Sequence, residues 1–112
     1  PHLNTVISVA RQELRRVPRS ARAYMYIGLA QTRLGKFKEG VDAATKASSL
    51  APEDYSILYK MAGLYSMQKK VEESLKWFRH AVQKRYSFKG ILDHDLYNIR
   101  DEAEFLQISR NP

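Results

Sequence analysis

The sequence predicts an all-α fold built from antiparallel helix hairpins, and two observations lead to that prediction. First, apolar residues recur with helical spacing, as between Leu3 and Val17, and no segment alternates apolar and polar residues as a strand would. Second, one pattern of large and small residues occurs twice, 34 residues apart: Tyr24 recurs as Leu58, and Gly28 recurs as Ala62. A fixed period of this length is typical of stacked supersecondary units that bind other molecules.

The ends of the expected helices are marked by residues that cap or stop a helix. Ser20 and Asp54 are suitable N-caps, because their side-chain oxygens can accept hydrogen bonds from free backbone N–H groups. Gly35 suits the left-handed conformation that follows a helix, whereas Pro18 and Pro52 cannot continue one. The expected helices span residues 3–17, 21–34, 37–50, 55–68 and 71–84. Because their connections are short, successive helices should pack antiparallel.

The repeat divides the 112 residues, about the size of one domain, into four segments. These segments are the second half of an incomplete repeat (1–19), two full repeats (21–54 and 55–88) and a C-terminal cap (89–112). The cap is expected to hold short helices near 93–99 and 101–108, and the alternative is an unrelated linker. The incomplete first repeat and the initial Pro indicate a chain cut from a longer protein, and the cap would place the chain's end near that protein's own C-terminus.

The spacing within each repeat resembles the signature of the tetratricopeptide repeat (TPR) family. That signature alternates large and small residues on both helices of a hairpin and closes with Pro. The residues that match it are Tyr24, Ile27, Gly28, Gly40, Ala47 and Pro52 in the first repeat, and Leu58, Met61, Ala62, Tyr65, Ser74, Phe78 and Ala81 in the second. Gln31 and Ala44 depart from it where aromatic residues are typical, and Tyr86 stands in place of Pro. The resemblance implies an α-solenoid that winds as a right-handed superhelix and ends in C-terminal capping helices.

In the TPR family the first helix of each hairpin lines a concave groove that binds peptides. The resemblance therefore implies groove positions beside the signature residues, namely Arg22, Met25, Tyr26, Leu29, Arg33, Tyr59, Lys60 and Met67. Apolar and aromatic residues that the signature packing does not use indicate a contact surface, and the basic residues suit a carboxylate-bearing segment. The alternative is that a neighbouring repeat or the capping helices cover these positions.

The chain is basic, with a formal net charge of +7. Residues 1–89 hold 17 Lys and Arg against 7 Asp and Glu, whereas residues 90–112 hold 2 against 5. This balance favours an acidic protein or peptide partner, and it is also compatible with a surface that merely keeps the chain soluble. Nucleic-acid binding is an alternative function, since a basic edge from Lys69 to Tyr86 could contact RNA. The period and the small-residue signature favour protein binding.

Other classes of function find no support in the sequence. There is no phosphate-binding Gly loop, nucleophile motif or metal-ligand spacing, so we expect no enzyme, catalytic residue, metal, cofactor or small-molecule substrate. No apolar run could insert into a membrane, and no secretory signal is present, which leaves the compartment open with a cytoplasmic location favoured. The expectation is a protein–protein interaction scaffold within a larger protein. Self-association through the open edge at residues 3–17 is a further alternative.

Overall fold

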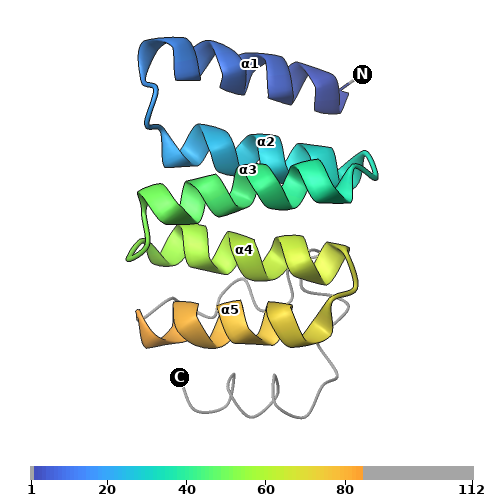
Figure 1. Ribbon diagram of the computed structural model, residues 1–112, viewed down its shortest axis with the longest axis vertical. Coiled ribbons are helices and arrows are strands. Elements are labelled where there is room, and N and C mark those ends of the chain that lie inside the picture. Colours follow the sequence, from blue (N-terminus) through green and yellow to red (C-terminus); the bar gives the residue numbers. More distant parts are fainter. Residues whose placement is uncertain (1, 85–112) are drawn as a thin grey trace. The chain divides into compact units, whose positions relative to one another are not determined.

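The computed structural model describes residues 2–84, and these form five helices and no strand (Figure 1). They are α1 (His2–Arg16), α2 (Ala21–Arg33), α3 (Phe37–Leu50), α4 (Tyr55–Met67) and α5 (Val71–Gln83). The predicted all-helical class and the five predicted helices are confirmed, each to within one residue at either end. The C-terminal cap predicted for 89–112, its two helices and the end of the second repeat lie outside the described residues.

The chain divides into two compact units after Pro52. The first unit contains α1, α2 and α3, and the second contains α4 and α5. Within each unit the short connections bring consecutive helices side by side, so that α2 and α3 form one hairpin and α4 and α5 form another (Figure 1). Residues at equivalent positions of the two hairpins lie 34 apart in the sequence.

The N-termini of α2 and α4 are capped by the two residues that the sequence indicates. The backbone N–H of Ala23 donates to Ser20 Oγ at 3.1 Å. At the second site, the backbone N–H groups of Ser56 and Ile57 donate to Asp54 Oδ1 at 2.8 and 3.3 Å. Each bond satisfies a donor that the first turn of a helix would otherwise leave without a partner.

The turns that close the two hairpins have the same geometry, 34 residues apart. Gly35 has a φ of +83°, as the sequence predicts, and Lys69 occupies the equivalent place with a φ of +61°. After each turn a backbone N–H reaches back to the preceding helix, from Lys36 to Gln31 O at 2.8 Å and from Lys70 to Tyr65 O at 2.9 Å. The 34-residue period of the sequence is therefore also a period of the backbone.

The helices of the first unit approach one another closely through small residues. Ala10 of α1 packs with Ala23 and Ile27 of α2 in one buried cluster. Between α2 and α3, a Cβ added at Gly28 would lie 2.8 Å from the carbonyl oxygen of Gly40. A Cβ added at Gly40 would lie 2.9 Å from the carbonyl oxygen of Gly28 and would collide with the hydroxyl of Thr32. The glycine pair thus allows the two backbones to touch.

The second unit is packed with larger side chains. Its buried cluster contains Leu58, Tyr59, Ala62, Leu75, Phe78 and Ala81, with Val71, Trp77 and Val82 packed against it. At the positions that correspond to Gly28 and Gly40, the second hairpin has Ala62 and Ser74. The buried hydroxyl of Ser74 donates a hydrogen bond to the carbonyl oxygen of Ala62 at 2.7 Å. A directed polar contact therefore joins α4 to α5 where bare backbone contact joins α2 to α3.

Candidate binding surfaces of the two hairpins

The predicted groove residues differ in how far the structure exposes them. Arg22, Tyr26 and Arg33 are exposed, Lys60 and Met67 are half-buried, and Met25, Leu29 and Tyr59 are buried. The three exposed residues follow one stripe of α2, since spacings of four and seven residues return to nearly the same side of a helix. We call Arg22, Tyr26 and Arg33 the α2 stripe. It is the part of the predicted set that a partner could reach directly.

One end of the α2 stripe is held in place by α1. Arg22 Nη2 donates to Glu13 Oε1 at 2.7 Å, and the hydroxyl of Ser20 also donates to the Glu13 carboxylate. These hydrogen bonds, first that from Arg22 and then that from Ser20, lower the pKa of Glu13. The same carboxylate raises the pKa of Arg22, and the neighbouring Tyr26 contributes in the same direction. The guanidinium is thus oriented before any partner arrives.

In the second unit, Tyr59 and Lys60 contact other residues of the unit itself. Tyr59 is only 8 % exposed and belongs to the cluster around Phe78. Lys60 Nζ donates to the hydroxyl of Ser56 one turn earlier on α4, at 2.9 Å. Met67 is half-buried at the end of α4. On the described residues, α4 therefore presents less reachable side chain than α2 does.

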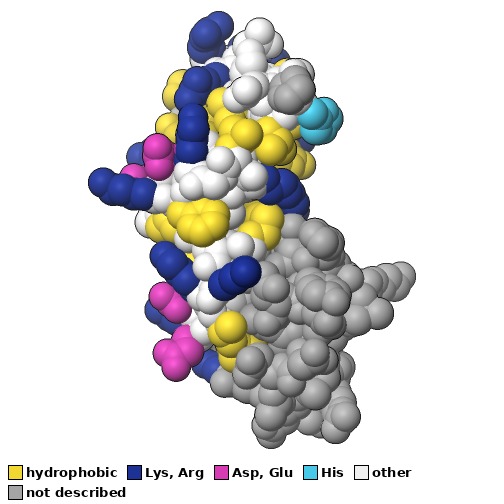
Figure 2. Space-filling model, turned by 90° about the vertical axis from the view of Figure 1, so that its right-hand side faces the viewer, with side chains coloured by type: hydrophobic (Ala, Val, Ile, Leu, Met, Phe, Trp, Pro, Cys, Tyr) yellow, Lys and Arg dark blue, Asp and Glu magenta, His cyan; other side chains and the backbone are white. Residues whose placement is uncertain are grey.

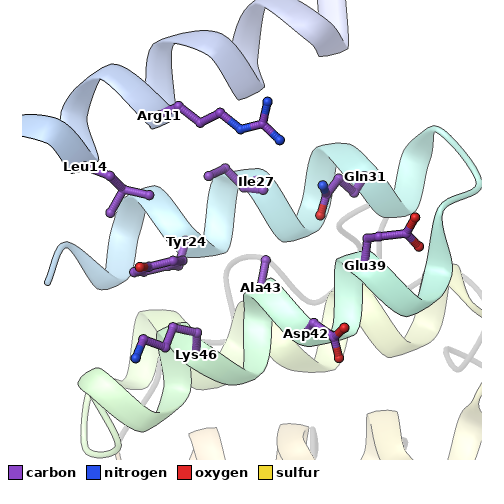
Figure 3. Close-up of a pocket in the computed structure, with 9 residues that line it drawn as sticks. All are labelled: Arg11, Leu14, Tyr24, Ile27, Gln31, Glu39, Asp42, Ala43 and Lys46. Carbon is purple, nitrogen blue, oxygen red and sulfur yellow. The ribbon is translucent and has the colours of Figure 1, made fainter. Parts of the chain in front are cut away.

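A second feature, a hollow among α1, α2 and α3, was not predicted from the sequence (Figure 3). Its volume is about 430 Å³, and it is lined by Arg11, Leu14, Tyr24, Ile27, Gln31, Glu39, Asp42, Ala43 and Lys46. Apolar side chains from all three helices line it, and charged groups of both signs stand at its rim. The signal that could have indicated it is Gln31, which stands where the repeat signature has an aromatic residue.

The surface of the described residues mixes apolar and basic groups. Large apolar side chains that are more than a third exposed include Tyr26, Phe37 and Tyr55. Figure 2 shows hydrophobic side chains at the surface between Lys and Arg side chains, with some Asp and Glu among them. A surface of this kind suits a partner that offers both carboxylates and apolar side chains.

Comparison with protein-family models and with curated proteins finds no match to this chain. Among residues 2–84, no helix combines the length and the apolar character needed to cross a bilayer. In the same residues, no three His, Asp or Glu side chains gather in a way that could hold a metal ion. Within residues 2–84, the α2 stripe and the hollow are the candidate sites.

Proposed function

We propose that this chain is a TPR-like repeat that acts as a protein–protein interaction scaffold. The observation that supports it is the 34-residue period of the backbone, seen in the matched turns at Gly35 and Lys69 and in the matched helix contacts at Gly40 and Ser74. Helical hairpins that repeat at such a period present rigid surfaces to other proteins. The proposal includes a right-handed solenoid with its groove lined by α2 and α4.

The proposed ligand is an acidic peptide segment that lies along the α2 stripe. Arg22 and Arg33 lie eleven residues apart, three turns of helix or about 16 Å, with the ring of Tyr26 between them. An extended segment of about five residues spans that distance. Its carboxylates would contact the guanidinium groups, and an apolar side chain would pack on Tyr26. Since Arg22 is already paired with Glu13, a ligand carboxylate would share or replace that partner.

The binding experiment uses short acidic peptides with a free C-terminal carboxylate, titrated into isotope-labelled protein while amide chemical shifts are followed. We expect the largest shifts at Arg22, Tyr26 and Arg33, and an affinity that falls as salt is added. The Arg33→Gln variant should bind about threefold to tenfold more weakly. Its matched control is Lys38→Gln, which removes one exposed positive charge from α3 and should leave binding within about twofold.

Two outcomes would contradict this function. Shifts confined to α3 and α5, with none near Tyr26, Tyr59 or Met67, would show that the groove assignment is wrong. A tight affinity for RNA with a steep loss on adding salt would favour nucleic-acid binding instead, because counterion release dominates such complexes. Light scattering on the same samples would reveal self-association, which predicts a mass that rises with concentration.

A further inference from the structure

The two hairpins carry different side chains at equivalent positions of one face. Trp77 and Tyr65 of the second hairpin correspond to Ala43 and Gln31 of the first, each 34 residues earlier. Trp77 packs against the buried cluster of its unit and stacks on the ring of His80, with 6.0 Å between the ring centroids. The second hairpin therefore covers this face with its own aromatic rings.

Charged groups accompany the aromatic rings in the second hairpin. Lys70 Nζ lies 5.8 Å from the centroid of the Tyr65 ring, within the range of a cation–π interaction. Burial, and then the nearby carboxylate of Glu73, raise the pKa of Tyr65. Glu73 corresponds to Glu39 of the first hairpin, which lines the hollow. The first hairpin thus keeps the acidic group of this face but lacks the rings.

Where those rings are missing, the first unit has the hollow shown in Figure 3. Ala43 and Ile27 line its apolar part together with Leu14 of α1. Arg11 extends from α1 toward the space above α2, and Lys46 lies beside Tyr24. Space that one hairpin fills with a tryptophan is thus left open in the other, between two cationic side chains.

We propose that the hollow receives a tryptophan side chain from a partner protein, seated on Ala43 as Trp77 is seated on its own hairpin. Two features favour an indole over an aliphatic side chain. Arg11 and Lys46 can lie against the faces of an aromatic ring, and Trp is the best cation–π acceptor among side chains. The oxygens of Gln31 and Glu39 at the rim can accept the indole N–H, which needs an acceptor when it is buried.

The tryptophan site is separate from the α2 stripe. Tyr24, Ile27 and Gln31 lie about half a turn around the helix axis from Arg22, Tyr26 and Arg33, at about 100° per residue. One partner side chain could therefore occupy the hollow while a peptide lies on the stripe. The inference does not depend on the proposed acidic ligand, and either can fail alone.

The test uses N-acetyl-tryptophanamide as an uncharged probe, with N-acetyl-leucinamide as the aliphatic control. Methyl shifts of Leu14, Ile27 and Ala43 are followed by NMR during each titration. We expect ring-current shifts at these three methyl-bearing residues, and saturation on the order of 1 mM for so small a ligand. Equal binding of the leucine probe, or shifts that occur only elsewhere, would overturn the proposal.

Variants then locate the probe. Ala43→Trp places the residue of the second hairpin in the hollow and should abolish the shifts at Leu14 and Ile27. If that variant fails to fold, Gln31→Tyr serves the same purpose with the other missing ring. Arg11→Gln should weaken binding about threefold, whereas Arg15→Gln, an exposed arginine of α1 outside the hollow, should not. Wild-type affinity in a folded Ala43→Trp protein would contradict the site.

Light scattering separates a partner protein from a second copy of this chain, whose only tryptophan is Trp77. We expect wild-type protein to remain monomeric at the concentration used for NMR. A dimer that Ala43→Trp dissociates would identify the occupant as another copy and would overturn the assignment to a separate partner.

Discussion

The two hairpins share one backbone plan and reach it with different chemistry. In α2 and α3, a pair of glycines lets the backbones touch, whereas α4 and α5 are joined by the hydroxyl of Ser74 on the carbonyl oxygen of Ala62. Phe78 fills the second hairpin at the position where the first has Ala44. Two helices of a repeat can therefore pack either through close contact of their backbones or through large side chains between them. This difference in packing also affects which surfaces are open to a partner.

The two hairpins differ in how much open space their side chains leave at the surface. The second has Tyr65 and Trp77 on the face that corresponds to the hollow, and its buried cluster contains large side chains. The first has small or polar residues at the same positions and retains the hollow. The second hairpin is thus the more completely filled of the two on this face, and both surfaces proposed above for a partner belong to the first unit.

Replacement of Phe78, the large residue of the second hairpin, by alanine should have the greatest effect on stability. Phe78 is 1 % exposed, so Phe78→Ala removes a buried ring and leaves a cavity, at a cost of about 3–5 kcal/mol in the free energy of unfolding. Urea denaturation followed by far-UV circular dichroism measures that loss. The surface variant Phe37→Ala, at a side chain that is 43 % exposed, should cost much less. Equal losses of stability for the two variants would show that the buried ring of Phe78 is not what stabilises the second hairpin.

Replacing Gly40 by serine, the residue that the second hairpin has at the equivalent position, should destabilise the first hairpin. Gly40→Ser introduces a Cβ that would lie 2.9 Å from the carbonyl oxygen of Gly28 and against the Thr32 hydroxyl. The backbones must separate, at a cost of about 1–3 kcal/mol in stability. Thermal and urea unfolding both report the change. A Gly40→Ser protein as stable as wild type would mean that the serine bond forms equally well in both hairpins.

The hydrogen bond from Ser74 to Ala62 O should contribute less to the free energy of unfolding than the glycine contact of the first hairpin. Ser74→Ala keeps the Cβ and removes the hydroxyl that donates to Ala62 O across the buried interface. The expected loss is about 1 kcal/mol, the usual net value of one buried hydrogen bond. Comparison with Ser48→Ala, whose hydroxyl donates within the exposed surface of α3, separates the interface bond from a local one. A loss no greater than that of Ser48→Ala would assign the contact to packing alone.

The turns allow a change that should stabilise the protein. Lys69 adopts a left-handed φ of +61° that its Cβ makes unfavourable, while Gly35 holds the equivalent turn without that strain. Lys69→Gly should therefore raise the free energy of unfolding by up to about 1 kcal/mol. The reverse exchange, Gly35→Lys, should lower it by a similar amount. If both exchanges destabilise, the side chain of Lys69 makes a contribution that the turn geometry does not explain.

Features of the fold that depend on neighbours in sequence could be predicted from the sequence. The helix ends follow from Ser20, Asp54 and Gly35, because capping and left-handed turns are local and involve residues within one helical turn. The 34-residue pairing of small positions likewise indicated where α2 and α3 approach. These are properties that a residue and its near neighbours determine with little help from the rest of the chain.

Features that depend on what lies over a helix were less accessible. Spacing places Met25 and Tyr26 on adjacent parts of α2, yet Met25 is fully buried and Tyr26 is 43 % exposed. The hollow could not be predicted because it forms only where three helices pack together. Gln31, which departs from the repeat signature, is the one lining residue that could have indicated its position. Helical spacing gives the direction of a side chain, whereas its burial depends on tertiary packing. For this reason the α2 stripe could be found only as part of a larger set.

The smallest expected effect concerns one carboxylate in each unit that an ion pair holds, Glu13 in the first and Glu53 in the second. Glu13 accepts hydrogen bonds from Arg22 and Ser20, and Glu53 accepts one from Lys84 at 2.7 Å. The pKa of each is lowered, in Glu53 chiefly by the hydrogen bond from Lys84. A lowered pKa in the folded state stabilises the protein above the unfolded value of about 4.3, and this stability is lost as the pH falls through the folded pKa.

Glu13→Gln should therefore lower the Tm at pH 7, and its difference from wild type should shrink as the pH falls from about 5 to about 3. Glu53→Gln should behave with the same sign and a smaller amplitude, because Glu53 has one charged donor in place of two hydrogen-bond donors. Both differences should decrease in high salt because added ions screen charge pairs at the surface, and the decrease should be larger for Glu53, whose side chain is 73 % exposed, than for Glu13, whose side chain is 21 % exposed. A Glu13→Gln effect independent of pH would assign the role of Glu13 to packing between α1 and α2, and a larger effect at Glu53 would reverse the ranking of the two units.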